Sequence, residues 1–279
     1  MATRLRDTRM RLLDDLRFEP TEKRVRAALG VDTVADTTRA VLVWEPRRVL
    51  PSYAVPMEDL RCDVAPSSAA PEDDDDPAEN PILHGGFPFT VHSTEGEALS
   101  VRVGDETLEG AAFRPSDTDL AGLVVLDFHA FAWWEEDEPI VAHPRDPFHR
   151  VDIRRSSRQV RIEFDGELLA ESSRPHLVFE TSLPVRFYLP PDDLRFPVRP
   201  AEKRARCAYK GEAFYVSLEL NGGVRSDLAW SYDNPLPDAA PLKGLVAFFD
   251  EKVDVTLDGE HRAHESEGIA ATIVQEADA

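Results

Sequence analysis

An internal repeat constrains the fold of this chain more than any other sequence feature. Residues 23–59 resemble residues 158–194 at a constant spacing of 135, which places Val25 opposite Val160. Nine of the thirty-two positions from Val25 to Pro56 are identical, whereas average residue usage would give about two. The identical pairs are Val25/Val160, Arg26/Arg161, Ala35/Ala170, Arg39/Arg174, Leu42/Leu177, Val43/Val178, Glu45/Glu180, Tyr53/Tyr188 and Pro56/Pro191. The chain is therefore expected to fold as two similar domains in tandem.

Later segments continue the repeat at changed spacings. Residues 96–99 match residues 211–214, and residues 120–124 match residues 242–246. The expected organisation is an N-terminal helix or extension over residues 1–20, a first repeat over 21–142, a joint over 143–157, a second repeat over 158–260 and a polar tail over 261–279.

Hydrophobic periodicity indicates β-structure in both repeats. Val160, Ile162 and Phe164 alternate with charged residues, and the Asp165-Gly166 pair that follows is typical of a tight hairpin turn. Four leucines between residues 5 and 16 are compatible with one short amphipathic helix. We therefore predict a mainly β protein of small antiparallel sheets with a short N-terminal helix.

An acidic segment interrupts the first repeat. Residues 63–80 contain a Pro-Ser-Ser sequence and the run Asp73, Asp74, Asp75 and Asp76, with few apolar residues. Consecutive carboxylates repel one another, so we predict a solvated, disordered loop. A calcium loop is the less favoured alternative, because the spaced ligands and turn glycine of such a loop are missing.

Charge and composition restrict the classes of function. The formal net charge of −21 disfavours binding to nucleic acid or to anionic membranes. Apolar runs of membrane-spanning length are missing, and the arginine-rich start lacks the apolar segment of a signal peptide, so a cytoplasmic location is expected. Cys62 and Cys207 are too few for a disulfide framework and are predicted to be free thiols.

Several separate motifs carry a resemblance to a known family. They are residues 143–152 with the sequence His-Pro-Arg-Asp-Pro-Phe-His-Arg-Val-Asp, residues 179–181 with Pro184 and Tyr188, residues 207–211, and residues 229–232. In this order they resemble the bacterial domain-of-unknown-function family 427 in a two-copy form, from about Leu16 to Gly259. The resemblance implies a β-tent fold in each half, with two antiparallel sheets meeting at an angle, as in methionine sulfoxide reductase B, the Yippee proteins and the thalidomide-binding domain of cereblon. It implies no established activity.

Metal and cofactor sites are not expected. Several proteins of the β-tent fold hold zinc through paired Cys-x-x-Cys elements, and this chain has no such pair. Cys207 lacks a partner cysteine at short spacing, which favours a structural role over a redox role. His261 and His264 could share a helical face as metal ligands, but their polar surroundings favour a tail. Glycine-rich phosphate loops are also missing, so we predict no cofactor.

A comparison of the two copies indicates a candidate ligand site. Tyr209 and Lys210 are aligned with Thr94 and Glu95 at the spacing of residues 211–214. Trp230, Ser231 and Tyr232 are aligned with Phe113, Arg114 and Pro115. Residues shared by both copies, such as Glu45/Glu180 and Tyr53/Tyr188, are interpreted as holding the fold, and residues found in one copy are better candidates for a site. The predicted ligand-binding residues are Glu180, Tyr188, Tyr209, Lys210, Trp230 and Tyr232; the alternative is that Trp230 and Tyr232 only fill the core.

Three functions remain open on this evidence. The first is binding of a small molecule in an aromatic, lysine-lined pocket of the second repeat, in which Lys210 faces a cavity and can be removed at little cost to stability. The second is an enzyme that uses Lys210 or the His143/His149 joint for acid–base chemistry on a small substrate. The third is a structural module that binds another protein. The joint offers His143, Arg145, Asp146, His149 and Arg150, but its prolines favour a rigid clamp over a catalytic site.

Overall fold

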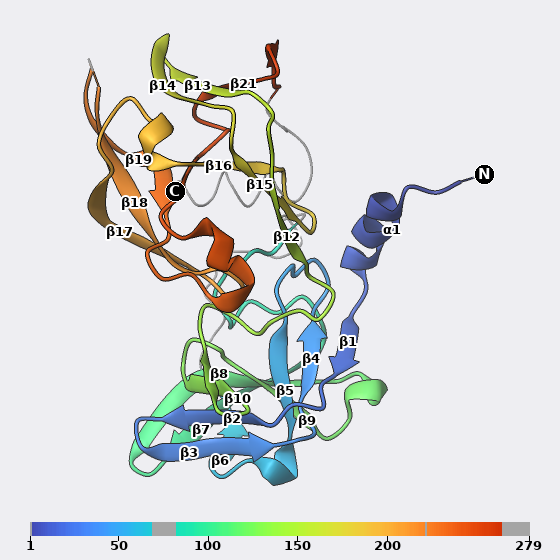
Figure 1. The fold of residues 1–279 in the computed structure, drawn as a ribbon. Coiled ribbons are helices and arrows are strands. Elements are labelled where there is room, and N and C mark those ends of the chain that lie inside the picture. Colours follow the sequence, from blue (N-terminus) through green and yellow to red (C-terminus); the bar gives the residue numbers. More distant parts are fainter. Residues whose placement is uncertain (1, 69–81, 221, 264–279) are drawn as a thin grey trace. The chain divides into compact units, whose positions relative to one another are not determined.

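The structure, a computed structural model, describes residues 2–68, 82–220 and 222–263 (Figure 1). The chain divides into two compact units, Met1–Asp146 and Pro147–Ala279. Each unit is built from one large and one small antiparallel sheet, and the predicted mainly β fold is confirmed. The helical elements are α1 (Leu5–Arg11) and the short 3-10 turns η1 (Leu12–Asp14), η2 (Met57–Asp59), η3 (Thr118–Leu120), η4 (Pro191–Asp193) and η5 (Pro237–Leu242).

In the first unit, the large sheet has the strand order β1-β4-β5-β9-β8-β7-β6. Its strands are β1 (Arg17–Pro20), β4 (Val41–Trp44), β5 (Ser52–Pro56), β9 (Leu123–Leu126), β8 (Glu106–Pro115), β7 (Gly96–Val103) and β6 (Asp63–Pro66). The small sheet has the order β11-β10-β2-β3, with β11 (Glu138–Ile140), β10 (Ala132–Glu135), β2 (Val25–Leu29) and β3 (Asp32–Thr37).

In the second unit, the large sheet has the strand order β12-β15-β16-β20-β19-β18-β17. Its strands are β12 (Val151–Arg155), β15 (His176–Glu180), β16 (Arg186–Leu189), β20 (Val246–Phe248), β19 (Gly223–Ser231), β18 (Gly211–Leu220) and β17 (Arg199–Cys207). The small sheet has the order β14-β13-β21-β22, with β14 (Glu167–Ser172), β13 (Val160–Phe164), β21 (Asp254–Leu257) and β22 (Glu260–His261). Read in chain order, both sheets connect their strands as the sheets of the first unit do.

Alternating burial explains how each unit closes around a core. In β13, Val160 and Ile162 are fully buried, while Arg161 and Glu163 between them are partly exposed. The buried residues of the small sheet pack with those of the large sheet, such as Leu177 and Val216, and form the major core of the second unit. Asp165 and Gly166 both have positive φ angles, of 50° and 78°, as a tight hairpin between β13 and β14 requires.

The boundaries of the domains differ from the expected ones at two places. Residues 17–20 form β1 of the first large sheet, although they were assigned to the N-terminal extension. Residues 151–155 of the predicted joint form β12, which pairs with β15. Both strands lie at sheet edges and are partly exposed. β1 has no apolar alternation to reveal it, whereas β12 alternates Val151 and Ile153 with charged residues over only a short stretch.

The acidic segment begins later than expected. Residues 63–66, assigned to the disordered loop, form β6 and pair with β7. An ion pair of 2.6 Å joins Asp63 to Arg102 of β7. The acidic run itself lies outside the described residues, as does most of the tail predicted over residues 261–279.

Candidate functional site

A second, smaller apolar cluster lies on the far side of the large sheet of the second unit. Successive residues of a strand point to opposite faces: Leu177 packs in the major core, whereas its neighbour Val178 packs in the smaller cluster. We call this cluster the minor core. Its buried members are Val178, Tyr188, Ala213, Tyr232, Ala239, Leu242 and Ala247, and Trp230 packs against them.

A buried ion pair lies beside the minor core. Glu180 is the last residue of β15, and Lys210 lies in the turn between β17 and β18. The Lys210 ammonium donates a hydrogen bond to Oε2 of Glu180, and the two side chains are only 12% and 7% exposed. Because Gly211 follows with a φ of +95°, the backbone can turn directly from Lys210 into β18.

His149 completes the surroundings of the glutamate. Pairing of Val151 with Glu180 brings the segment before β12 alongside the end of β15. Nε2 of His149 then lies 3.1 Å from Oε1 of Glu180. The imidazole ring stacks on Tyr209, with ring centroids 4.2 Å apart. His149, Glu180, Tyr209 and Lys210 therefore form one polar cluster.

Glu180 and Lys210 both keep their charges around neutral pH. Burial alone would raise the pKa of Glu180, but Lys210 and His149 lower it, to about 2. Burial alone would lower the pKa of Lys210, but the Glu180 carboxylate raises it well above its usual value. Neither group exchanges a proton near pH 7, which is what general acid–base catalysis requires. The geometry therefore favours electrostatic positioning over proton transfer by Lys210.

The aromatic residues of the minor core are linked to the polar cluster. Trp230 Nε1 donates a 3.0 Å hydrogen bond to the hydroxyl of Tyr188, and the Tyr232 ring lies 6.5 Å from the Tyr188 ring. Burial raises the pKa of Tyr188 to about 12 and raises that of Tyr232 further, so both phenols are neutral. Of the aromatic residues among the six predicted ligand-binding residues, Trp230 is partly exposed, whereas the three tyrosines are buried.

The five predicted joint residues are divided between the two units. His143, Arg145 and Asp146 belong to the first unit, and His149 and Arg150 to the second. His143 Nδ1 lies 2.7 Å from the carbonyl oxygen of Pro144. Of the two joint residues in the second unit, His149 contacts Glu180, and Arg150 binds Asp152 at 2.8 Å.

Strand register corrects one of the expected equivalences between the two units. Leu42 pairs with Tyr53 in the first unit, and its equivalent Leu177 pairs with Phe187 in the second. On the other side, Ala54 pairs with Val125 and Tyr188 pairs with Ala247, which are equivalent residues of the next strand. Ala54 and Tyr188 therefore occupy the same position. The identity Tyr53/Tyr188 is thus displaced by one residue, and a one-residue shift turns a strand side chain to the opposite face. Tyr53 lies in the major core and Tyr188 in the minor core.

The alignment of Lys210 also changes. A β-bulge follows Leu99 in the first unit and Val216 in the second, so the spacing in these strands is 117 and not 115. When this spacing of 117 is extended back to the residues that precede the two strands, Tyr209 corresponds to His92 and Lys210 corresponds to Ser93. The expected matches with Thr94 and Glu95 were wrong by two residues, whereas the match of Trp230 with Phe113 is retained.

The first unit buries its own glutamate with different partners. Glu45, the equivalent of Glu180, accepts a 2.8 Å hydrogen bond from the backbone N–H of Ser93. Its Oε1 lies 3.0 Å from Nδ1 of His92 and 3.7 Å from Nε of Arg48. The shared glutamate is therefore a feature of both units, and the lysine and tyrosines around it belong to the second unit.

Sequence reasoning missed a second charged cluster in the second unit. Arg186 of β16 binds Glu251 through two hydrogen bonds, of 2.9 and 2.5 Å, and lies 3.6 Å from Asp250. Its guanidinium carbon lies 5.9 Å from the centre of the Trp230 ring. Arg186 lies 65 positions before Glu251 in the chain, and Asp250 is the neighbour of Glu251. Because the Asp250-Glu251 pair has no local motif, nothing in the sequence connects it with Arg186.

The cysteines are both free and partly buried. Burial, with a smaller contribution from Asp63, raises the pKa of the Cys62 thiol to about 11. Iodoacetamide at pH 8 should therefore label Cys62 slowly in the native protein and rapidly in urea, because the thiolate is the reactive form. Mass spectrometry of the labelled peptides measures both rates, and equal rates would contradict the burial of this thiol.

Within the described residues, no group of three or more His, Cys, Asp or Glu side chains is arranged to hold a metal ion. In the same part of the chain, no helix is long and apolar enough to cross a membrane. His264 lies outside the described residues, so its proposed pairing with His261 is not described.

Comparison with known proteins gives a family match within the second unit. No curated protein matches the chain. One segment of the second unit matches a family model. This segment begins within β12 and ends after β21, and it includes every residue of the polar cluster except His149. Residues 152–259 match the model of the family described as a domain of unknown function, DUF427.

Proposed function

We propose that the second unit binds a small molecule at the edge of the polar cluster. One observation supports this above the others: the lysine and the two tyrosine hydroxyls on this side of the second unit have no counterparts at the equivalent positions of the first unit. The positions of Tyr188, Lys210 and Tyr232 are Ala54, Ser93 and Pro115 there. The first unit nevertheless buries Glu45, so burying the glutamate does not require a lysine or these hydroxyls.

The chemistry of the cluster indicates what such a ligand offers. An ammonium group has three donors, and one of them is directed at Glu180. Trp230, which donates a hydrogen bond to Tyr188, adds a partly exposed aromatic residue on the same side of the sheet. A ligand with an anionic or carbonyl group and a flat apolar part would match these two features.

We also infer that the first unit is a second copy of the same domain. The strand orders of both sheets correspond, and the β-bulges fall at equivalent residues. The first copy would then serve as scaffold while the second carries the binding site. A cytoplasmic location is part of this proposal.

Thermal shift tests the proposal with a matched pair of tyrosine variants. Screening with nucleotides, carboxylic acids and sugar phosphates should yield at least one compound that raises the melting temperature in a saturable way. Tyr232→Phe should weaken that response, because Tyr232 belongs to the aromatic set beside Lys210. Tyr53→Phe is the control: it removes a buried hydroxyl from the first unit, where Tyr53 binds Glu135 at 2.7 Å.

The outcomes separate the three functions. If both variants change the stabilisation by a compound to the same extent, that compound binds at another site. Turnover of a hit would identify an enzyme. A complete absence of hits would favour the interaction module, because a flat protein-binding surface gives no saturable stabilisation by small compounds.

A further inference from the structure

A hollow of about 270 Å³ lies between two hairpins of the second unit, apart from the polar cluster. One wall is the Asp165-Gly166 turn between β13 and β14 with the flanking Phe164 and Glu167. The other wall is the tip of the β18–β19 hairpin with Leu220, Gly222, Gly223 and Arg225. No residue of the polar cluster or the minor core lines it.

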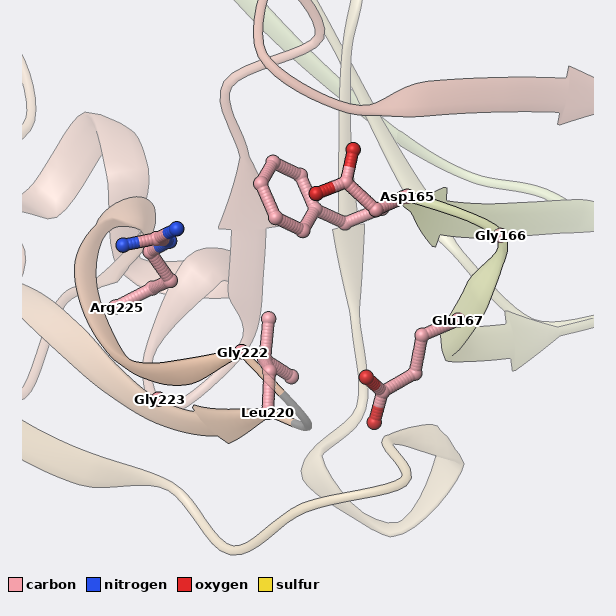
Figure 2. Close-up of a pocket in the computed structure, with 8 residues that line it drawn as sticks. Asp165, Gly166, Glu167, Leu220, Gly222, Gly223 and Arg225 are labelled. Carbon is pink, nitrogen blue, oxygen red and sulfur yellow. The ribbon is translucent and has the colours of Figure 1, made fainter.

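The hollow has opposite charges on its two sides. Figure 2 shows the side chain of Arg225 on one side and Glu167 on the other, with Leu220 between them. Within the described residues, the side chains of Arg225 and Asp165 make no hydrogen bond or ion pair. Phe164 and Leu220, which are partly buried, pack against the major core and give the hollow an apolar floor.

The first unit shows why this hollow exists. After the β-bulge, Leu218 pairs with Arg225, and the equivalent pair in the first unit is Val101 with Leu108. Leu108 packs against the major core of the first unit, as does Leu29, the equivalent of Phe164. A leucine at this position adds to the core, whereas an arginine leaves the core and presents a cation to the hollow.

We propose that this hollow binds a small zwitterion with an apolar body, of which a dipeptide is the simplest example. A purely anionic ligand would be repelled by Asp165, Glu167 and the net charge of −21. A purely cationic ligand would be repelled by Arg225. A molecule whose carboxylate faces Arg225 and whose ammonium faces Asp165 matches the charges on both sides, and its apolar part covers Phe164 and Leu220.

The test uses the full chain and three probes that differ in one charge at a time. They are the dipeptide Leu-Gly, its N-acetyl derivative, which lacks the ammonium, and its C-terminal amide, which lacks the carboxylate. Titration followed by NMR should show Leu-Gly binding near the β13–β14 turn, and each of the two derivatives should bind about tenfold more weakly.

Two variants assign the charges to residues. Arg225→Leu copies the first unit and should keep the fold; it should bind Leu-Gly about tenfold more weakly and no longer discriminate against the amide. Asp165→Asn retains a residue that tolerates the positive φ, and it should reduce discrimination against the N-acetyl derivative. Arg199→Leu is the control, because Arg199 is paired with Glu219, is 57% exposed and does not line the hollow.

Three results would overturn the proposal: no binding of Leu-Gly at tens of millimolar, affinity that depends on one of its charges alone, or unchanged affinity in Arg225→Leu. Tyr232→Phe should leave Leu-Gly binding intact. This outcome makes failure at the hollow distinguishable from failure of the site proposed at the polar cluster.

Discussion

Lys210→Ala should lower the free energy of unfolding of the second unit by about 3–5 kcal/mol, because it leaves a buried carboxylate without its main partner. Glu180 is 7% exposed, and the His149 ring would remain as its neighbour at 3.1 Å. Urea denaturation followed by circular dichroism and tryptophan fluorescence measures the loss. The sequence interpretation, in which Lys210 faces a cavity and is cheap to remove, does not hold for a lysine that is 12% exposed and bound to Glu180.

The pH dependence of this loss has a defined sign. The pKa of Glu180 is lowered from 4.5 to about 2, so its contribution to stability is present above about pH 4.5 and is lost as the pH falls through 2. In Lys210→Ala the pKa of Glu180 should rise, and the variant should lose less stability than the wild type over this range. The deficit of the variant is therefore expected to be largest at neutral pH and to shrink in acid.

Two further variants make the interpretation specific. Lys243→Ala removes an exposed lysine and should change the unfolding free energy by less than about 0.5 kcal/mol. The double variant Lys210→Met with Glu180→Leu removes both charges and should be more stable than Lys210→Ala, because no unpaired ion remains buried. If Lys210→Ala costs less than about 1 kcal/mol, water or another group must neutralise Glu180 in that variant.

Asp250→Asn should stabilise the second unit at pH 7 by about 1–3 kcal/mol. Asp250 Oδ2 is buried, and the described residues provide it with no hydrogen bond. Burial raises the pKa of this carboxyl from 3.8 to about 6, although Arg186 acts in the opposite direction. Arg186 keeps its two hydrogen bonds to Glu251 in the variant, so the guanidinium is not left unpaired.

The sign of the pH effect follows from proton binding. Between about pH 3.8 and 6 the folded state binds more protons at Asp250 than the unfolded state does, so stability falls as the pH rises through this window. The variant should lack this fall, and its advantage over the wild type should disappear below about pH 4. Urea midpoints measured from pH 4 to 8 give both profiles, and Asp254→Asn serves as an exposed control. Destabilisation by Asp250→Asn at pH 7 would show that Arg186 needs both carboxylates.

Local sequence patterns were sufficient for the class of fold and for its turns. The alternation in β13 and the Asp165-Gly166 pair predicted a half-buried hairpin, because side chains in a strand alternate between faces and because this turn needs two positive φ angles. Strand β6 was missed, since an exposed edge strand such as residues 63–66 has no apolar alternation to reveal it.

The partners of the candidate site depended on long-range geometry. The repeat drew attention to Glu45 and Glu180, and both are indeed buried carboxylates. The repeat could not show that Ser93 and His92 contact Glu45, whereas Lys210 and His149 contact Glu180. These contacts span 30 to 48 positions in the chain and arise from the turns that end the strands.

By itself, the sequence determined that this chain forms mainly antiparallel sheets, because strand periodicity and turn chemistry are local properties. It also showed that a glutamate recurs at the same position of each repeat. Only the tertiary structure decided which face each side chain occupies. Tyr53 and Tyr188 are identical in an ungapped alignment, yet they lie in the major core of one unit and the minor core of the other. The loop between their strands differs by one residue, and in a strand with a period of two a shift of one residue moves a side chain from one side of the sheet to the other.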